Sequence, residues 1–213
     1  MIKTIIIDED KTSRLGIKSL LTDDSIEIVG EAADGSSGIK LAFAEKPDVI
    51  ILEFYLPDML GSQVCRVINR KIPSAKILFL TNCSHLYTLT SLLGTPAQGL
   101  MQKDTDAFSM ISAIKMLYEG RSYIQPDMAL QLIKYLIEKP AEGVHSLSEK
   151  EYQITLMVAQ KKTHEKIAEN LFISPKTVSN LKSSAMRKLA VKTVDQLQDK
   201  LLKDGILPNY CLS

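Results

Sequence analysis

Short aliphatic runs alternate with helical patterns five times along the first half of the chain. The runs are rich in Ile, Val and Leu and comprise Lys3–Ile7, Glu27–Gly30, Val49–Leu52, Lys76–Leu80 and Gln98–Met101. Apolar residues three and four positions apart mark the intervening segments, which are Arg14–Leu21, Gly38–Ala44, Ser62–Arg70, Leu86–Leu93 and Phe108–Tyr118. This alternation predicts an α/β domain with a doubly wound, five-stranded parallel sheet and helices on both faces.

Polar side chains follow four of these predicted strands. Asp8 and Glu9 follow the first run, Glu53 the third, Thr81 the fourth and Lys103 the fifth. Because parallel strands end at the same edge of a sheet, we expect these side chains to converge. Carboxylate oxygens with a nearby lysine suit a hard divalent cation and a phosphoryl group. The sequence therefore predicts an acidic pocket at this edge.

Residues 1–120 resemble the receiver domain of response regulators, and the match covers all five strand ends. The resemblance implies a flavodoxin-like fold. It implies that Asp8 and Glu9 match the acid pair that holds Mg²⁺ in this family. It also implies that Thr81 and Lys103 match the residues that detect a phosphoryl group, which a histidine kinase places on an aspartate after the third strand.

Two positions depart from the receiver pattern. Glu53 replaces the phosphate-accepting aspartate, and Leu100 replaces the aromatic residue that usually acts as the switch. The extra methylene of Glu53 carries its charge toward the phosphoryl position and misplaces the nucleophile for in-line attack. We therefore predict that Glu53 is not phosphorylated and holds the domain partly in the active form. The alternative is that Glu53 binds Mg²⁺ and accepts phosphate slowly.

A second domain is expected after a helix and a linker. Pro126 opens an amphipathic pattern, and the polar stretch from Lys139 to Ser146 reads as a linker. Ser148 with Glu151 three residues later has the spacing of a capping box, which predicts a new helix. The expected organisation is a receiver domain at 1–124, a helix and linker at 125–146, and a DNA-binding domain at 147–213.

The second domain has a helix-turn-helix pattern. A short helix at Glu165–Leu171 is followed by a tight turn and a longer helix from Lys176, in a stretch with no acid between Glu169 and Asp195. Steps of about 100° per residue place an apolar stripe on one side of the longer helix and small polar residues with arginine on the other. The predicted DNA-contacting residues are Lys176, Thr177, Ser179, Asn180, Lys182, Ser183, Arg187 and Lys188.

The segment Leu147–Val191 resembles the DNA-binding domain of the LuxR/NarL (FixJ) family. The match rests on Leu147-Ser-x-x-Glu, Ile167-Ala-x-x-Leu-Phe-Ile-Ser-x-Lys-Thr-Val and Arg187-Lys-Leu-x-Val. In that family the positions of Ser179, Asn180 and Ser183 face DNA. Ser179 and Leu181 replace the usual lysine and histidine, and this helix looks more like the capsule-regulator branch.

The last predicted helix carries Val194, Leu197 and Leu201 at positions i, i+3 and i+7. The family resemblance implies that this stripe forms a dimer interface. A two-fold dimer predicts half-sites about one helical turn apart. The alternative is that the stripe packs on the core of its own domain.

Other classes are disfavoured by composition and motifs. No apolar run approaches the ~20 residues of a membrane span, and the N-terminus does not read as a cleaved signal peptide. The three cysteines are scattered, which fits free thiols in a cytoplasmic protein. The three histidines lie away from the acidic edge, and no Walker or dinucleotide glycine pattern occurs, so we expect no enzyme.

The sequence thus predicts a regulator of transcription that binds double-stranded DNA as a dimer, independently of phosphorylation and without a required cofactor. RNA polymerase is an expected further partner, and a membrane is not. Two alternatives stay open. The chain could be an adaptor that forms a heterodimer with another regulator, a role suggested by Ser179 and Leu181, or a conventional regulator driven by phosphorylation.

Overall fold

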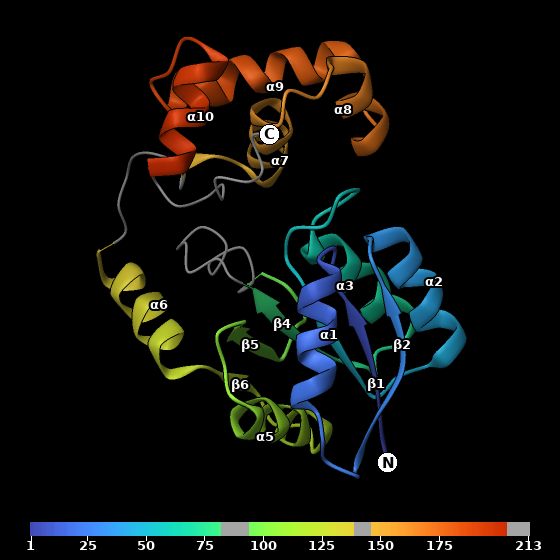
Figure 1. Cartoon of the computed structure of the whole chain (residues 1–213). Helices are drawn as coiled ribbons and strands as arrows, with labels where there is room; N and C mark the ends of the chain where they lie inside the picture. The colour runs from blue at the N-terminus through green and yellow to red at the C-terminus, as the bar shows by residue number, and fades with distance from the viewer. Residues whose placement is uncertain (82–93, 139–145, 204–213) are drawn as a thin grey trace. The chain divides into compact units, whose positions relative to one another are not determined.

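A computed structural model describes residues 1–81, 94–138 and 146–203 of the chain (Figure 1). These residues form two compact units, and the boundary between them falls between Leu132 and Ile133. The predicted helix Leu86–Leu93 and most of the predicted linker lie outside the described residues. Among the described residues, no helix is both long enough and apolar enough to cross a membrane.

A parallel sheet forms the centre of the first unit. Its strands are β1 (Ile2–Ile7), β2 (Ile26–Ala32), β3 (Val49–Leu52), β4 (Lys76–Thr81), β5 (Gly99–Gln102) and β6 (Tyr123–Ile124). They lie in the order β2-β1-β3-β4-β5-β6, and every neighbouring pair is parallel. The strand order turns back at β1, so the ends of β1 and β3 border the crevice where such sheets bind ligands.

The sheet has six strands, whereas the sequence predicted five. The five predicted strands are present, and β6 extends the edge next to β5. The Tyr123 amide donates to the Gln98 carbonyl, and the Gln125 amide donates to the Leu100 carbonyl. Two residues are too few to show an alternating pattern, so backbone pairing makes this strand without a sequence signal.

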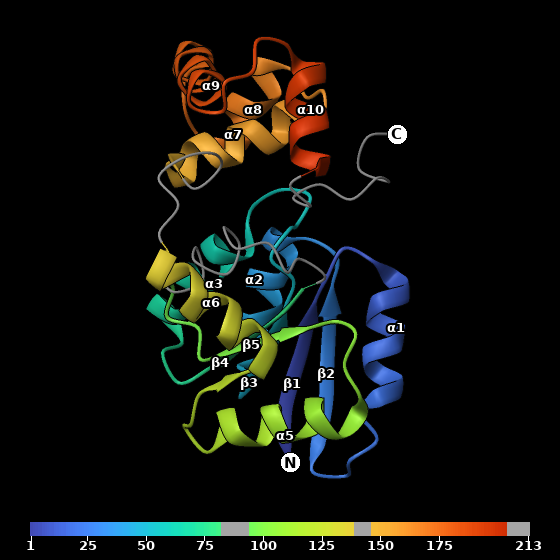
Figure 2. The same cartoon turned by 90° about the vertical axis from the view of Figure 1, so that its left-hand side faces the viewer.

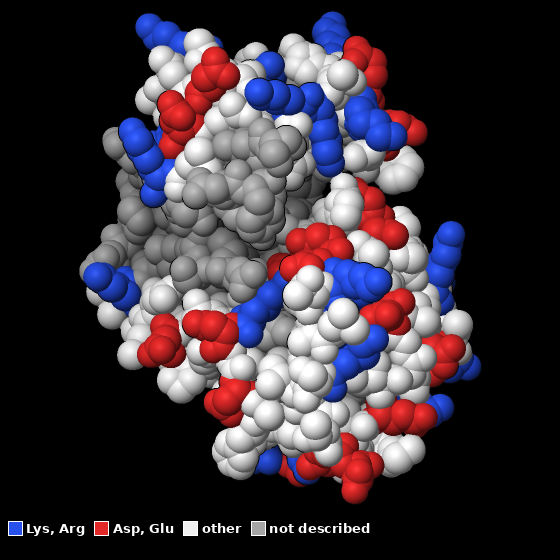
Figure 3. Space-filling model, in the orientation of Figure 1, with Lys and Arg blue, Asp and Glu red and all other residues white. Residues whose placement is uncertain are grey.

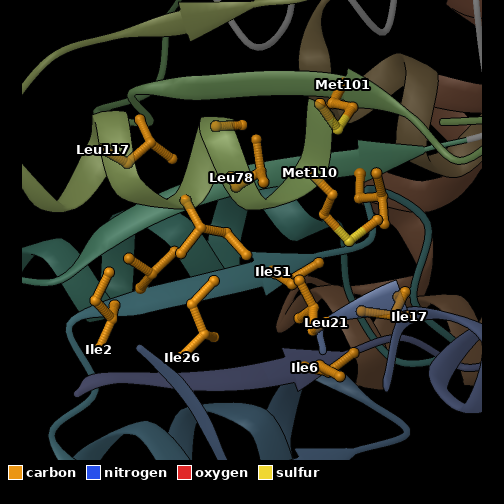
Figure 4. Close-up of a cluster of buried hydrophobic side chains, with 14 residues drawn as sticks. Ile2, Ile6, Ile17, Leu21, Ile26, Ile51, Leu78, Met101, Met110 and Leu117 are labelled. Carbon is orange, nitrogen blue, oxygen red and sulfur yellow. The ribbon is translucent and has the colours of Figure 1, made fainter. Parts of the chain in front are cut away.

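Helices cover both faces of the sheet. They are α1 (Lys11–Leu20), α2 (Gly35–Glu45), α3 (Gly61–Lys71) and α5 (Ala107–Tyr118). Helix α6 (Pro126–Glu138) follows β6. Figure 2 shows α1 and α5 on one face and α2 and α3 on the other. On the α1 and α5 face, Ile17 and Leu117 pack with strand residues such as Ile51 and Leu78 into one buried apolar cluster (Figure 4). This double coverage explains why the strands are almost continuously apolar.

The second unit contains four described helices after α6. They are α7 (Glu149–Ala159), α8 (His164–Leu171), α9 (Pro175–Lys188) and α10 (Val194–Lys203). The predicted capping box is present at α7, where the Ser148 amide donates to Glu151 and the Glu151 amide donates to the Ser148 hydroxyl. Thr163 and Ser174 cap α8 and α9 in the same way through their side-chain oxygens.

The apolar stripe of α10 packs within its own domain. Leu197 and Leu201 are buried, with exposed fractions of 1% and 0%, and α10 contacts α7. Val194 is partly exposed. In this arrangement Leu197 and Leu201 pack within their own domain, which is the alternative that the sequence left open, and the dimer interface stays a prediction. Periodicity identifies an apolar face but not what covers it.

Helix α6 crosses the boundary between the two units. Met128 and Leu132 are buried, whereas Leu130, Ile133 and Ile137 are exposed. The predicted amphipathic helix is therefore present, but its apolar residues divide between two sides. Residues of α6 up to Leu132 belong to the first unit, and those from Ile133 belong to the second.

Candidate functional site

The predicted acidic pocket forms at the carboxyl edge of the sheet. The ammonium group of Lys103 lies 2.7 Å from Asp8 Oδ2 and 2.7 Å from Glu53 Oε2. Both carboxylates are buried, with exposed fractions of 2% for Asp8 and 4% for Glu53. The sequence-predicted residues Asp8, Glu53 and Lys103 are thus brought into direct contact by strands β1 and β3 and the end of β5.

Glu53 also contacts groups beside Lys103. Its Oε1 accepts hydrogen bonds from the amides of Phe54 and Tyr55, at 2.5 and 3.2 Å. The hydroxyl of Thr81, buried at the end of β4, is a further hydrogen-bonding partner. The carboxylate of Glu53 therefore contacts both residues that the receiver resemblance assigns to detection of a phosphoryl group.

The position of Glu53 depends on a close approach of α3. Gly61, the first residue of this helix, donates its amide to the Phe54 carbonyl at 2.7 Å. A Cβ at Gly61 would lie 2.4 Å from the Glu53 carbonyl oxygen. Only glycine fits here without moving the backbone that carries Glu53.

Two pocket residues were not identified from the sequence. Ser13 donates its hydroxyl hydrogen to Asp8 Oδ2 at 2.7 Å, and Arg14 donates to the Asp8 carbonyl at 2.6 Å. The Asp10 amide donates to Asp8 Oδ1 at 2.9 Å. Ser13 and Arg14 lie in the first turns of α1, a few residues after the strand that Asp8 follows. This closeness in sequence was the signal that could have placed them in the pocket.

Burial and neighbouring charges shift the pKa values in this pocket. Burial raises the pKa of Glu53, although Lys103 and Thr81 act in the opposite direction. Burial lowers the pKa of Lys103, but Glu53 and Asp8 outweigh it, so the net pKa is raised. Desolvation raises the pKa of Glu9 to about 7, and repulsion by Glu53 adds to this shift. The pocket therefore concentrates negative charge around one lysine.

Hydrogen-bond donors occupy the carboxylate oxygens of Asp8 and Glu53 in this arrangement. Lys103 and Ser13 donate to one oxygen of Asp8, and the Asp10 amide donates to the other. Glu53 is similarly engaged at both oxygens. Among the described residues, no group of three or more Asp, Glu, His or Cys side chains is placed to hold a metal ion. Mg²⁺ usually binds proteins through one or two carboxylates and keeps several waters, so Mg²⁺ binding at Asp8 and Glu9 stays a prediction.

The substituted switch position is buried next to β6. Leu100 lies on β5 between Phe79 of β4 and Ile124 of β6 in the sheet register. The Gln102 amide donates to the side chain of Gln125 at 2.8 Å, which adds a second link between β5 and the residues after β6. The strand that carries Leu100 is thereby attached to the start of α6.

Asp58, in the loop after β3, contacts the start of α2. Its carboxylate accepts hydrogen bonds from the amides of Gly35 and Ser36, at 2.8 and 2.9 Å, and from the Ser36 hydroxyl at 2.6 Å. Burial raises the pKa of Asp58, but these hydrogen bonds outweigh it and the net pKa is lowered. Asp58 thus fixes the loop that follows Glu53 to the start of α2.

In the second unit, α9 exposes the polar face that helical geometry predicted. Val178, Ala185 and Leu189 are buried, and Leu181 is partly buried. The exposed members of the predicted DNA-contacting set are Lys176, Ser179, Asn180, Ser183, Arg187 and Lys188, whereas Thr177 and Lys182 are partly buried. Figure 3 shows Lys and Arg side chains on this unit, interspersed with acidic ones. The polar face is suited to a major groove, where small polar side chains and arginine can reach base edges.

Lys188 differs from the rest of this set. Its ammonium lies 2.7 Å from Glu151 Oε2 and donates to the Ser146 carbonyl at 3.1 Å. Its charge is therefore neutralised within the domain, which argues against the predicted contact with a phosphate. We remove Lys188 from the set of proposed DNA contacts.

Glu151 is the centre of this internal network. Its carboxylate accepts hydrogen bonds from the Ser148 amide, the Ser184 hydroxyl and Lys188, at 2.7, 2.6 and 2.7 Å. Burial raises the pKa of Glu151, but these donors lower it to a net value of about 2. Glu151 therefore joins the start of α7 to the far end of α9. The sequence identified it only as a helix cap.

Two family models match the chain. The response regulator receiver domain matches residues 4–115, and the luxR family of bacterial regulatory proteins matches residues 145–200. The response regulator GacA of Pseudomonas aeruginosa is 31% identical over 210 residues, which cover 97% of this chain and 98% of GacA.

Solved structures of the response regulator RcsB are similar to the whole chain. One structure, from Salmonella typhimurium, is 26% identical, with a TM-score of 0.76, and covers 95% of this chain and 98% of RcsB. Another, of two RcsB dimers bound to two parallel DNAs, is 25% identical, with a TM-score of 0.59, and covers 94% and 98%. The chain therefore belongs to the response regulators that join a receiver domain to a LuxR-type helix-turn-helix DNA-binding domain.

Proposed function

We propose that this response regulator controls transcription by binding a specific DNA sequence without phosphoryl transfer to its receiver domain. The observation that carries the proposal is the set of contacts made by Glu53. Its carboxylate contacts Lys103 and Thr81, and it accepts two backbone amide hydrogen bonds. Glu53 thus supplies negative charge to the two groups that would otherwise detect an added phosphoryl group.

The charge of Glu53 is a partial substitute for a phosphoryl group. A phosphoryl group carries about −2 and three acceptor oxygens, whereas a carboxylate carries −1 and two oxygens. Both oxygens of Glu53 are already engaged, and its side chain is almost completely buried. In-line attack on a phosphoryl donor would require Glu53 to leave these partners.

Intact-mass measurement tests the absence of phosphoryl transfer. The purified chain is incubated with Mg²⁺ and acetyl phosphate, and we expect no added phosphoryl mass. A phosphoryl adduct that disappears in Glu53→Ala would contradict the proposal and favour a conventional, phosphorylation-driven regulator. A chain with Glu53→Asp is the positive control, because it restores the side chain that the family uses.

The proposal includes no required cofactor. With Asp8 and Glu53 both held by Lys103, DNA binding is expected to be the same with Mg²⁺ and with a chelator. Titration of Mg²⁺ into the chain, followed by NMR of the pocket amides, measures binding directly. NMR chemical-shift changes confined to residues around Asp8 and Glu9 at low millimolar Mg²⁺ would show Mg²⁺ binding and contradict the absence of a cofactor.

DNA binding is tested with the unmodified protein and a pool of random duplex DNA. We expect rounds of selection to enrich a near-palindromic motif. Affinity for this motif should fall steeply with salt, because Lys176 and Arg187 displace counterions from phosphates. No enrichment by the protein alone, followed by enrichment when a second regulator is added, would favour the adaptor alternative suggested by Ser179 and Leu181.

We propose that the DNA-bound form is a dimer, as in the RcsB structure that contains dimers on DNA. Since Leu197 and Leu201 are buried in their own domain, we expect exposed residues to form the dimer interface. Light scattering of the chain with and without the selected duplex measures the stoichiometry. One chain per duplex would contradict the dimer.

The remaining parts of the proposal concern setting and partners. We propose a non-enzymatic, cytoplasmic regulator that acts on RNA polymerase at its promoters. A reconstituted transcription reaction with the selected motif upstream of a promoter tests this. Equal transcript levels with and without the chain would contradict it.

A further inference from the structure

Phe172, in the turn between α8 and α9, has an environment that the fold does not account for. Its side chain is 95% exposed. Among residues 146–203, Phe172 is the only large hydrophobic residue whose side chain is exposed. A fully exposed aromatic ring forgoes the stabilisation that burial gives.

The backbone of Phe172 is also unfavourable for a bulky residue. Its φ of 52° lies in the left-handed region, where it ends α8, and its amide donates to the Ala168 and Glu169 carbonyls. Glycine or asparagine occupies such helix ends at the lowest cost. The other described residues with positive φ, glycine apart, are Lys46, Lys161 and Ala190. Phe172 is the aromatic one among them.

The neighbourhood of Phe172 indicates what the ring contacts. Ser174, two residues later, caps α9, and Lys176 in the first turn is exposed. Glu169, three residues before Phe172, is paired with Lys166 at 2.9 Å, and no further acidic residue occurs until Asp195. A partner at this end of α9 therefore carries negative charge, and it also offers apolar surface to the ring. Duplex DNA has both, because deoxyribose carbons and thymine methyl groups lie beside the phosphates.

We propose that Phe172 is an apolar contact to duplex DNA, with its ring against deoxyribose carbons or thymine methyl groups next to the first turn of α9. This inference rests on the proposed DNA binding. It adds a residue outside the polar face of α9 to the interface. Because an apolar contact displaces no counterion, it contributes affinity without changing the salt dependence.

The test uses the full chain and a fluorescent duplex that carries the motif enriched by selection. Phe172→Asn places a residue that tolerates positive φ at this position and removes the ring. We expect affinity to fall about tenfold, the slope against salt to stay unchanged, and the melting temperature to stay equal or rise. Loss of binding together with equal or greater stability separates a DNA contact from a residue that supports the fold.

Ala190→Asn is the matched control. Ala190 has φ of 55° beyond the opposite end of α9, is exposed, and is neutral like Phe172. We expect it to bind the duplex as the wild type does. Lys176→Ala is the contrasting variant. Loss of a phosphate contact lowers the affinity and also reduces the slope of log affinity against log salt concentration by about one.

A second duplex, with deoxyuridine in place of every thymidine, identifies the contacted atoms. If the wild type loses affinity for it and Phe172→Asn does not, the ring contacts a thymine methyl group. If the effect of Phe172→Asn is the same on both duplexes, the ring contacts sugar. Equal or tighter binding by Phe172→Asn, or a clearly lower melting temperature, would overturn the inference. Failure of the wild type to enrich any motif would overturn the proposed function as well, so the two failures are distinguishable.

Discussion

Each unit of this protein contains a buried glutamate paired with a lysine at 2.7 Å, yet the pKa values of the two glutamates are shifted in opposite directions. The pKa of Glu53 is raised, whereas that of Glu151 is lowered to about 2. Glu53 shares its lysine with a second buried carboxylate, Asp8. Glu151 has Lys188 to itself and two further donors in Ser148 and Ser184.

The difference shows how similar ion pairs can have distinct roles. Around Glu151 every donor stabilises one charge, so the pair joins α7 to α9 and contributes to the fold. Around Lys103 two buried carboxylates compete for one cation, so the receiver pocket holds unfavourable charge that a change in state can relieve. Burial outweighs the contacts with Lys103 and Thr81 in setting the pKa of Glu53, whereas the donors around Glu151 outweigh its burial, and this balance separates the two pairs.

The largest effect is expected from Glu151→Ala. Removing this carboxylate leaves Lys188 and Ser184 without this partner and removes the acceptor of the Ser148 amide, so we expect the second unit to lose about 3 kcal/mol. Hydrogen exchange followed by mass spectrometry measures this locally, as faster exchange in α7 and α9. Glu169→Ala is the control, because its ion pair with Lys166 is exposed, and it should cost less than about 1 kcal/mol. A similar cost in both variants would remove the distinction between the two pairs.

A smaller effect is expected from Lys103→Met in the receiver domain. Methionine fills a similar volume but leaves Asp8 and Glu53 without a cation, and we expect a loss of about 2 kcal/mol. Adding Glu53→Gln should restore part of the stability, since it removes one of the two uncompensated charges. Urea titration measures both variants. Lys115→Met is the control, because its pair with Asp23 is partly exposed. No rescue by Glu53→Gln would show that the two carboxylates do not compete.

The pH dependence of stability should also distinguish the units. Glu9 has its pKa raised from 4.5 to about 7, so the folded state binds its proton more tightly than the unfolded state. Its stabilising effect is therefore lost as pH rises from about 5 to 7.5, by about 1 kcal/mol after allowance for solvent screening. Glu9→Gln should remove this dependence in urea titrations and stabilise the receiver domain near pH 7.5.

Glu151 should act in the opposite direction and in a different range. Its pKa falls from 4.5 to about 2 on folding, so its contribution is present above about pH 4.5 and is lost as pH falls toward 2. Amide hydrogen exchange in α7 and α9 should stay much slower than exchange in an unfolded chain between about pH 7.5 and 5. Destabilisation of α7 and α9 in that range would contradict the assigned role of Glu151.

The smallest effect concerns the two basic residues at the ends of α9. Lys176→Ala should reduce the slope of DNA affinity against salt by about one, because it removes a phosphate contact. Lys188→Met should leave this slope unchanged and instead destabilise the second unit, since Lys188 binds Glu151. Fluorescence anisotropy at several salt concentrations compares them. Equal changes in slope would return Lys188 to the DNA-contacting set.

Much of the fold and part of the site could be predicted from local sequence patterns. The aliphatic runs predicted β1 to β5, and the common edge of parallel strands predicted that Asp8, Glu53 and Lys103 meet. Helical geometry predicted which side of α9 is exposed. These features depend on spacing along the chain, which a sequence displays directly.

The features that were missed depend on contacts between distant segments. The pairing of Glu151 with Lys188 joins residues 37 positions apart, and the capping of α2 by Asp58 joins residues 22 and 23 apart. The burial of Leu197 and Leu201 depends on where α7 lies. No periodicity specifies the partner of a charged or apolar side chain, so these contacts required the folded structure.

The engagement of Glu53 has a consequence for how such a regulator is controlled over time. An aspartyl phosphate is an acyl phosphate, which water hydrolyses, so a conventional receiver returns to its resting state unless a kinase acts again. The carboxylate of Glu53 is part of the polypeptide and cannot be removed by hydrolysis. Under the proposed function, the duration of the response then equals the lifetime of the protein. Synthesis and proteolysis of the chain would set its output, in place of a kinase and a phosphatase.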